Sequence, residues 1–299
     1  WSFGTSDQNQ LVQESDEIRY TDGGTLGPDE YRYTNGGAVM DVDGDGGYEV
    51  IVGRGEGEAI ADSKLYWYDE PSDAPYWEEH YIADTGEGNY VAPHDIQPLS
   101  VALSSGERVR GVVGNIGREQ VFFLEIPEDP TEPWIRHDVG SFGGGEHSGM
   151  EIIDVNDDGR TDIVTGMFWV ETPEDPRRDD WTFHRYGSWD ESNEGWGGMN
   201  MHGVADFDGD DQVEFVVTEA EIPDARLAIF DRTSADGTGQ WNSTMITRGI
   251  DAPHSLVTAD FNDDGQPDFA VGEMTAGGWN FPLNPNPTIW AYINQGDGS

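Results

Sequence analysis

Four acidic segments carry oxygen side chains at a spacing suited to binding a metal ion. Segments 41–49, 154–162, 206–214 and 260–268 each place Asp, Asn or Glu at positions 1, 3, 5 and 9 of a tight loop. Calcium takes about six to eight oxygen ligands, and position 7 of such a loop can add a backbone carbonyl. We therefore predict about four structural Ca²⁺ sites, with these ligands: Asp41, Asp43, Asp45, Glu49, Asp154, Asn156, Asp158, Asp162, Asp206, Asp208, Asp210, Glu214, Asp260, Asn262, Asp264 and Asp268.

An ordinary acidic turn is the alternative explanation for any one of these loops. Glycine at position 6 permits the sharp turn in three loops, whereas Asp211 replaces it in segment 206–214 and weakens the prediction there. An apolar strand follows every copy, as in 163–165 after the second loop. Four copies in this one context favour cation binding over chance.

Four histidines form a second group that could carry chemistry. Each stands at the start of a predicted strand: His94, His147, His202 and His254. They could cap these strands structurally, share a transition metal such as Zn²⁺, Mn²⁺ or Fe²⁺, or act as acid and base on a bound sugar. The other three histidines, in Trp-x-x-His segments ending at 80, 137 and 184, indicate a repeated structural hydrogen bond between neighbouring units.

Further site residues are predicted near the same strand ends. Arg54 follows an apolar strand and could bind a carboxylate or sulfate of a ligand, or simply pair with the nearby Glu56 or Glu58. Aromatic side chains on glycine-rich connections are typical stacking platforms for sugar rings. The predicted substrate-binding residues are Tyr90, Trp196, Trp279, Asn115, Glu219 and Glu273.

The elements that position these residues repeat along the chain. The last three loops recur every 52 to 54 residues, and the gap after the first loop fits two such periods. Each period contains four short strands: one entering the loop, one leaving it, an aromatic third and a fourth that begins with Trp. Four-stranded units in series predict an all-β fold, a five-bladed β-propeller over residues 35–299. The fifth unit lacks its last strand, so we expect segment 17–20 or 30–33, from an N-terminal segment 1–34, to complete it and close the ring.

The chain resembles the FG-GAP/VCBS family of calcium-binding propellers. The Asp-x-Asp/Asn-x-Asp-Gly-x-x-Asp/Glu loops followed by Val/Ile-Val-x-Gly carry this resemblance over roughly residues 35–299. The aromatic third strand and the Trp-x-x-His strand are similar to the saccharide-active subset, such as aldos-2-ulose dehydratase and polysaccharide lyases. The resemblance implies calcium in the loops and action on saccharides.

The charge of the chain indicates its surroundings. Sixty acidic residues against fifteen basic ones give a formal net charge of −45. Molar salt shortens the Debye length to about 3 Å and screens this self-repulsion, so we expect a protein of brine, with an acidic protein of ordinary salt as the alternative. Nucleic acid and membrane insertion are excluded as partners by the charge and by the absence of a long apolar run. The chain has no cysteine, which leaves calcium as the expected staple.

Two functions remain open from the sequence. The first is a secreted or cell-surface enzyme that eliminates acidic saccharides, with a leader removed before Trp1 or trimmed away, the histidines and Arg54 as catalytic residues and a monomeric chain. The second is a non-catalytic lectin or adhesion propeller, which needs only the calcium loops and the exposed aromatic residues.

Overall fold

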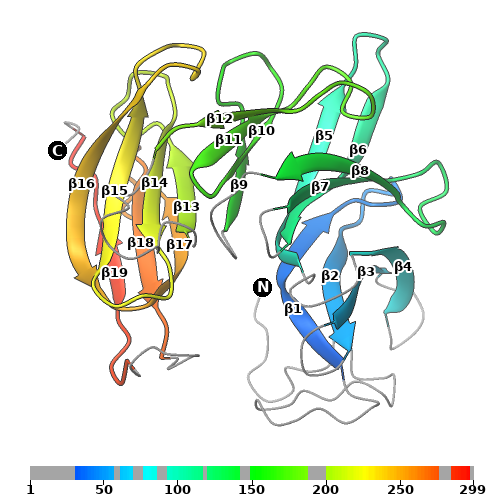
Figure 1. The fold of residues 1–299 in the computed structure, drawn as a ribbon, viewed down its shortest axis with the longest axis horizontal. Helices are drawn as coiled ribbons and strands as arrows, with labels where there is room; N and C mark the ends of the chain where they lie inside the picture. Colours follow the sequence, from blue (N-terminus) through cyan, green and yellow to red (C-terminus); the bar gives the residue numbers. More distant parts are fainter. Residues whose placement is uncertain are drawn as a thin grey trace. The chain divides into compact units, whose positions relative to one another are not determined.

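Strands and turns make up the described part of the protein. The computed structural model describes residues 31–56, 61–69, 77–85, 93–116, 120–141, 149–187, 200–275 and 284–296, and none of these residues is helical. No helix in this part of the chain could cross a membrane. The strands form five antiparallel sheets in which each strand pairs with the next along the chain (Figure 1). The predicted all-β class is therefore confirmed.

The chain divides into two compact units, and the first contains two sheets. This unit comprises residues 1–100 and 108–140. The first sheet contains β1 (Tyr31–Met40), β2 (Glu49–Glu56), β3 (Ala61–Asp69) and β4 (Glu78–Asp84). The second sheet contains β5 (Pro93–Ala102), β6 (Arg108–Ile116), β7 (Gln120–Glu125) and β8 (Ile135–Ser141).

The second unit comprises residues 101–107 and 141–299. Its third sheet contains β9 (Met150–Ile153), β10 (Asp162–Thr165), β11 (Phe168–Glu171) and β12 (Thr182–Arg185). Its fourth sheet contains β13 (Asn200–Ala205), β14 (Glu214–Glu219), β15 (Ala225–Arg232) and β16 (Trp241–Ile250). Its fifth sheet has three strands, β17 (Pro253–Ala259), β18 (Asp268–Glu273) and β19 (Ile289–Tyr292).

These five sheets follow the predicted repeats and are consistent with a propeller-like fold. A closed ring of five blades stays a prediction. One proposed closing strand, 30–33, is wrong, because residues 31–33 pair with Glu56, Gly55 and Arg54 inside the first sheet. The other proposal, segment 17–20, lies outside the described residues.

Aromatic side chains fill the space between consecutive sheets in the second unit. Trp169 and Phe215 are fully buried, and the ring of Tyr186 packs edge-on against Phe215 at 4.9 Å and Phe230 at 5.3 Å. Large aromatic rings of this kind bury much apolar surface and dominate the energetics of a protein core. The third and fourth sheets therefore share one core.

Tryptophans from neighbouring sheets share a backbone acceptor. The indoles of Trp169 in β11 and Trp241 in β16 both donate to the carbonyl of Gly237, at 3.2 and 2.9 Å. In the first unit, Trp67 in β3 and Trp134 both donate to the carbonyl of Pro130, at 3.2 Å each. The predicted Trp-led strand thus has a physical reason: its indole satisfies a carbonyl that the preceding sheet also uses.

The histidines of the outer strands are structural, but the predicted bond between neighbouring units is wrong. His184 stacks on Trp169 at 4.1 Å and its Nε2 lies 3.0 Å from Glu171, within one sheet. His137 likewise lies 3.0 Å from Glu125 of its own sheet. A strand side chain faces its cross-strand neighbours first, so the pairing stays within the sheet.

Candidate cation-binding loops and strand-start residues

The four acidic loops adopt one backbone conformation. Position 4 has a positive φ in every loop, with 82° at Gly44, 60° at Asp157, 79° at Gly209 and 60° at Asp263. Position 6 is also left-handed, and Asp211 takes a φ of 66° where the other loops use glycine. Asp tolerates this region better than most residues. Glycine predicted the turn at position 6, whereas position 4 was not predicted, although Gly and Asp alternate there from loop to loop.

Backbone amides hold the position 1 carboxylates in place. In loop 154–162, Asp154 accepts the N–H of Asp158 at 3.1 Å and that of Gly159 at 2.8 Å. In loop 260–268, Asp260 accepts the N–H of Asp264 and that of Gly265 at the same two distances. The loops are therefore ordered by the chain itself, with the carboxylates already facing the turn.

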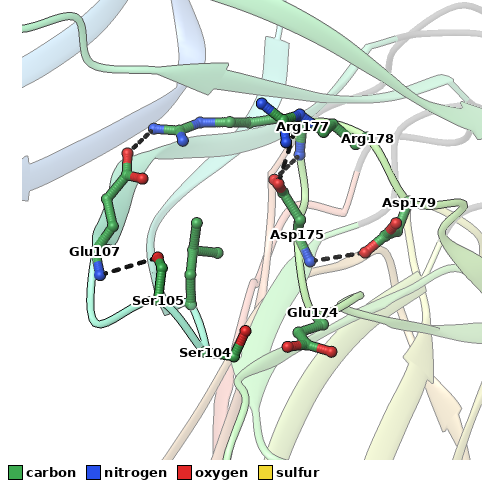
Figure 2. A pocket seen from close by; sticks show the side chains of 9 residues that line it. Ser104, Ser105, Glu107, Glu174, Asp175, Arg177, Arg178 and Asp179 are labelled. Atoms are coloured by element: carbon green, nitrogen blue, oxygen red, sulfur yellow. Dashed lines mark hydrogen bonds and ion pairs between the residues drawn. The ribbon is translucent and has the colours of Figure 1, made fainter.

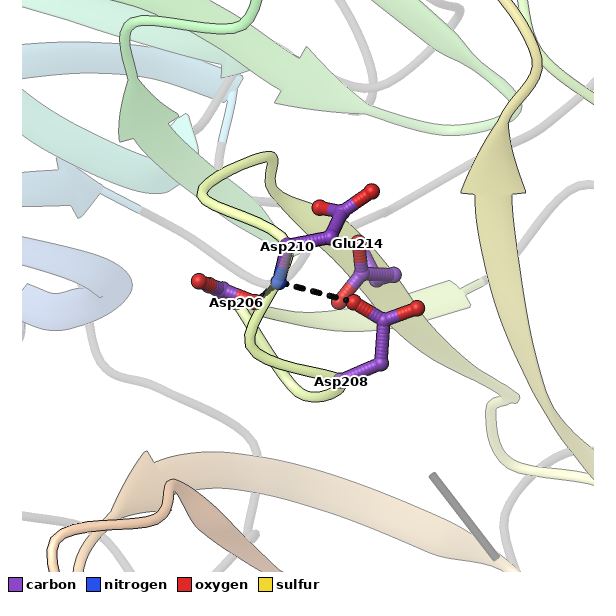
Figure 3. A group of neighbouring side chains, drawn as sticks. All are labelled: Asp206, Asp208, Asp210 and Glu214. Carbon is purple, nitrogen blue, oxygen red and sulfur yellow. Dashed lines mark hydrogen bonds between the residues drawn. The ribbon is translucent and has the colours of Figure 1, made fainter. Parts of the chain in front are cut away.

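Loop 206–214 gathers four carboxylates around one point. Oxygens of Asp206, Asp208, Asp210 and Glu214 lie within 4.8 Å of one another. Figure 3 shows three of them on the turn and Glu214 on the strand that follows. Glu214 is 2% exposed, its Oε2 accepts the N–H of Phe207 at 2.6 Å, and its Oε1 has no hydrogen-bond partner in the described structure. A buried carboxylate oxygen without a partner is costly, so this geometry suits a cation.

Burial and neighbouring carboxylates disfavour the ionised form of Glu214. Burial, followed by repulsion from Asp208, Asp206 and Asp210, raises the pKa of Glu214 to about 7, although the N–H of Phe207 opposes the shift. Desolvation and like charges both disfavour an ionised carboxylate. A bound cation would remove this penalty.

The first loop has a similar but smaller group. Oxygens of Asp41, Asp43 and Glu49 lie within 4.8 Å of one another. Glu49 is buried and accepts the N–H of Val42 at 2.6 Å, and burial together with neighbouring carboxylates raises its pKa. Glu49 at position 9 therefore resembles Glu214 of loop 206–214: it accepts a backbone N–H of the turn and lies among the other carboxylates of its loop.

Asparagine at position 3 changes the other two loops. In loop 154–162, the amide of Asn156 donates to Asp158 at 3.2 Å, and in loop 260–268 Asn262 donates to Asp264 at 2.9 Å. Asp162 is fully buried, and burial raises its pKa to about 7. These loops offer one carboxylate fewer, with an amide oxygen as the neutral replacement ligand.

His202 is part of the interior rather than of a site. It is 3% exposed on β13, and its Nε2 lies 2.7 Å from the carbonyl of Gly166, which also accepts the hydroxyl of Tyr186 at 2.8 Å. Burial lowers the pKa of His202 to about 4, and the backbone of Gly166 and Gly149 offsets only part of this. The structure therefore favours the capping alternative for this histidine over a catalytic role.

His254 is half-buried and carries a carboxylate partner. Its Nε2 lies 3.1 Å from Glu221, and this contact raises the pKa of His254 against the opposing effect of burial. The surrounding backbone is unusual, with φ of 60° at Glu221, 56° at Asp224 and 51° at Ala252. Strained non-glycine residues of this kind concentrate at functional sites. Glu221 was not predicted as a site residue, because its contact with His254 joins two different sheets.

Both oxygens of Glu219 are engaged, which argues against the predicted contact with substrate. Arg226 binds them through its guanidinium, with Nε 2.8 Å from Oε2, and both side chains are buried. Glu273 accepts the Trp290 indole at 3.0 Å and the Asn284 amide at 3.0 Å. Burial opposes ionisation of Glu273, but these hydrogen bonds and those from backbone amides outweigh it and lower its pKa.

The remaining predicted residues fall into two groups. Asn115 is buried on β6, where its Oδ1 accepts the N–H of Asp95 at 3.0 Å, and His94 is half-buried on β5. Arg54 lies on β2, and its side chain is outside the described structure. Also outside it are these predicted residues: Tyr90, His147, Trp196 and Trp279. Among the described residues, the groups able to hold a metal contain only carboxylates, so a histidine-bound transition metal has no support there.

A polar hollow of about 390 Å³ lies in the second unit, between turn 103–107 and segment 174–179. Figure 2 shows Arg177 reaching Glu107, at 2.7 Å, and Arg178 beside Asp175, at 3.8 Å. The arginines are thus matched by acids of the same hollow. No predicted site residue lines it.

Comparison with known proteins supports the repeat. An FG-GAP-like repeat model matches residues 206–271, which contain the last two acidic loops. The crystal structure of a protein of unknown function from Dyadobacter fermentans DSM 18053 is similar at 12% identity with a TM-score of 0.43, covering 88% of this chain and 79% of that chain. No curated protein gave a significant match. The chain thus carries an FG-GAP-like repeat within an all-β fold.

Proposed function

We propose that this protein is a cation-stabilised repeat scaffold that binds Ca²⁺ in its four acidic loops. The observation that carries the proposal is the buried Oε1 of Glu214, which lacks a partner inside a group of four carboxylates. Side chains at positions 1, 3, 5 and 9 would hold the ion. Oxygen ligands and flexible geometry favour Ca²⁺ over the smaller Mg²⁺, which keeps several waters.

Thermal unfolding in molar salt tests this function. The chelated protein is compared with protein in excess Ca²⁺ and in excess Mg²⁺, and we expect Ca²⁺ to raise the melting temperature by several degrees. A site filled at a hundred times its Kd contributes about 2.7 kcal/mol. Asp208→Asn should lose part of this gain, whereas the exposed Asp180→Asn, with the same charge change, should keep it. An equal response of all forms to Ca²⁺ and Mg²⁺ contradicts specific binding.

We also propose a secreted or cell-surface protein of a high-salt environment. The support is the net charge of −45, together with acidic loops whose oxygen ligands suit the weak calcium sites of extracellular modules. Far-ultraviolet circular dichroism across a salt series checks it, and we expect the folded signal to strengthen toward molar salt as repulsion is screened.

A second candidate function is action on an acidic saccharide, favoured by the His254–Glu221 pair in its strained surroundings. In a β-elimination, neutral His254 would take the proton from the carbon beside the uronate carboxylate. The bond from the adjacent carbon to the glycosidic oxygen then breaks, a carbon–carbon double bond forms, and the imidazolium returns the proton to the departing oxygen. Glu221 would orient the ring and support its positive charge.

Release of unsaturated product from uronate polymers tests this second function. We expect His254→Gln to abolish product, while His80→Gln on an outer strand keeps it. Product formation unchanged in His254→Gln excludes this residue as the base. Saccharide binding without product in the unaltered protein would instead support a lectin.

A further inference from the structure

The peptide at position 2 of an acidic loop is shared between two sheets. In loop 206–214, the N–H of Phe207 donates to the position 9 carboxylate of Glu214 at 2.6 Å. The carbonyl of Phe207 accepts the side-chain amide of Asn294, from the fifth sheet, at 2.6 Å. One residue of the turn is therefore held by a predicted cation ligand on one side and by the next sheet on the other.

Asn294 also holds a ligand of its own sheet. Its backbone N–H donates to Asp268 at 2.8 Å, and Asp268 is position 9 of loop 260–268. The path from Glu214 to Phe207, to Asn294 and to Asp268 consists of three hydrogen bonds and links the position 9 carboxylates of two loops. All four residues belong to the second unit.

The same contact recurs one sheet earlier. In loop 154–162, the N–H of Val155 donates to Asp162 at 3.0 Å, and the carbonyl of Val155 accepts the guanidinium of Arg232. Arg232 also pairs with Asp157 of that loop at 2.7 Å. In the first unit, Arg110 donates to the carbonyl of Asp41 in loop 41–49. A donor from the following sheet thus meets position 1 or 2 in three loops.

Strand register shows that Arg232 and Asn294 occupy equivalent places. Phe215 directly follows loop 206–214 and pairs with Phe230, and Arg232 lies two residues after Phe230. Phe269 directly follows loop 260–268 and pairs with Tyr292, and Asn294 lies two residues after Tyr292. The equivalent residue of the third sheet is Thr172, since Val170 pairs with Ile163.

Thr172 provides an internal contrast. The sheet before it has the short turn 103–107 in place of an acidic loop. The hydroxyl of Thr172 donates within its own sheet, to the carbonyl of Thr161 at 2.6 Å, while its N–H donates to Asp162 at 2.9 Å. In the fourth and fifth sheets, a long donor occupies this place and the preceding sheet has an acidic loop, whereas the third sheet has a short side chain there and its preceding sheet has no such loop. In the second sheet the donor is Arg110 of β6 instead.

We propose that loops 206–214 and 260–268 bind divalent cations cooperatively, with Asn294 as the positioning residue that couples them. This inference rests on the proposed cation binding. A cation in either loop fixes a position 9 carboxylate, which orders one end of the hydrogen-bonded path and lowers the cost of ordering the other end. By linkage, each loop raises the affinity of the other by the same factor.

Residue-resolved calcium titration of the full chain tests the coupling. In protein labelled with ¹⁵N at glycine, Gly209 reports on loop 206–214 and Gly265 on loop 260–268, since both amides donate to position 1 carboxylates. Molar salt suppresses long-range charge effects. We expect Asp208→Asn to raise the calcium Kd read at Gly265 roughly five-fold, the effect of losing about one hydrogen bond. In an Asn294→Ala background, Asp208→Asn should leave that Kd unchanged.

Two further variants keep the result decisive. Gln295→Ala is the matched control, because the Gln295 amide donates to the nearby carbonyl of Ile293, and it should retain the five-fold effect. Asn294→Asp removes the donor at constant size and should uncouple the loops if Asn294→Ala does not fold. A Kd at Gly265 that ignores Asp208→Asn, or a cross-effect that survives loss of the Asn294 amide, overturns the coupling. Absence of any calcium response at the loop glycines refutes cation binding itself.

Discussion

The acidic loops and the histidine-bearing strand starts recur with the same period, but they differ in how uniform they are. All four loops repeat one conformation, down to the left-handed residue at position 4. The strand starts diverge: His202 is buried against the carbonyl of Gly166, whereas His254 is half-buried and bound to Glu221. Uniform geometry is expected where every repeat performs the same structural task. Divergent geometry leaves room for one sheet to acquire a separate role.

The largest expected effect separates the cation role of a loop from its folding role. Glu214→Gln keeps an acceptor for the N–H of Phe207 but removes the charge that a cation needs. At calcium a thousandfold above Kd, we expect the variant to lose about 4 kcal/mol of unfolding free energy. In chelator it should equal or exceed the unaltered protein, because a repelled buried carboxylate is gone. Urea unfolding with and without calcium measures both; a loss of equal size in chelator would show a purely structural role.

The next effect concerns His202 and its pH dependence. Its folded pKa of about 4 lies below the unfolded value of 6.5, so the unfolded chain binds more protons between these pH values. Stability should therefore be complete above pH 6.5 and fall by roughly 3 kcal/mol as pH drops toward 4. His202→Gln should remove this part of the slope. Unfolding in saturating calcium at several pH values checks it, and identical slopes would place the charge change elsewhere.

A smaller effect compares two loops at position 6. Asp211 holds a φ of 66° that glycine adopts without strain, so Asp211→Gly should stabilise the protein by about 0.5–1 kcal/mol. Gly265→Ala, at a φ of 86° in loop 260–268, should destabilise it by about 1 kcal/mol. Chemical unfolding in chelator measures both changes. Shifts of the same sign would contradict the common backbone conformation.

The smallest effect is at His254. Glu221 raises its pKa, so this pair adds stability that is complete below the unfolded pKa and is lost as pH rises through the folded one. Because the ring is half-exposed, solvent screening keeps the gain below about 1 kcal/mol. Titration of the ring by NMR should give a pKa above 6.5 that falls in Glu221→Gln. A pKa that stays the same would break the contrast with His202.

Most of the correct predictions came from the spacing of residues that lie close together in the sequence. The positions of the loops, the all-β class and the four-strand period follow from residues close in sequence, such as Asp154 and Asp162. Contacts that depend on how sheets pack did not follow from it. Glu221 meets His254 across 33 residues, and Asn294 meets Phe207 across 87. Likewise, the burial of His202 depends on Gly166 and Tyr186 of another sheet, which periodicity along β13 does not reveal.

Two tryptophan indoles share one backbone acceptor at the junction between the third and fourth sheets, so tryptophan fluorescence reports on that junction. Trp169 and Trp241 donate to one carbonyl, that of Gly237, and Trp169 is fully buried. If these sheets part, water replaces that carbonyl as partner, and indole fluorescence shifts to longer wavelength. The protein therefore contains a natural, label-free reporter of sheet separation, and it lies beside Val155 at position 2 of the acidic loop 154–162.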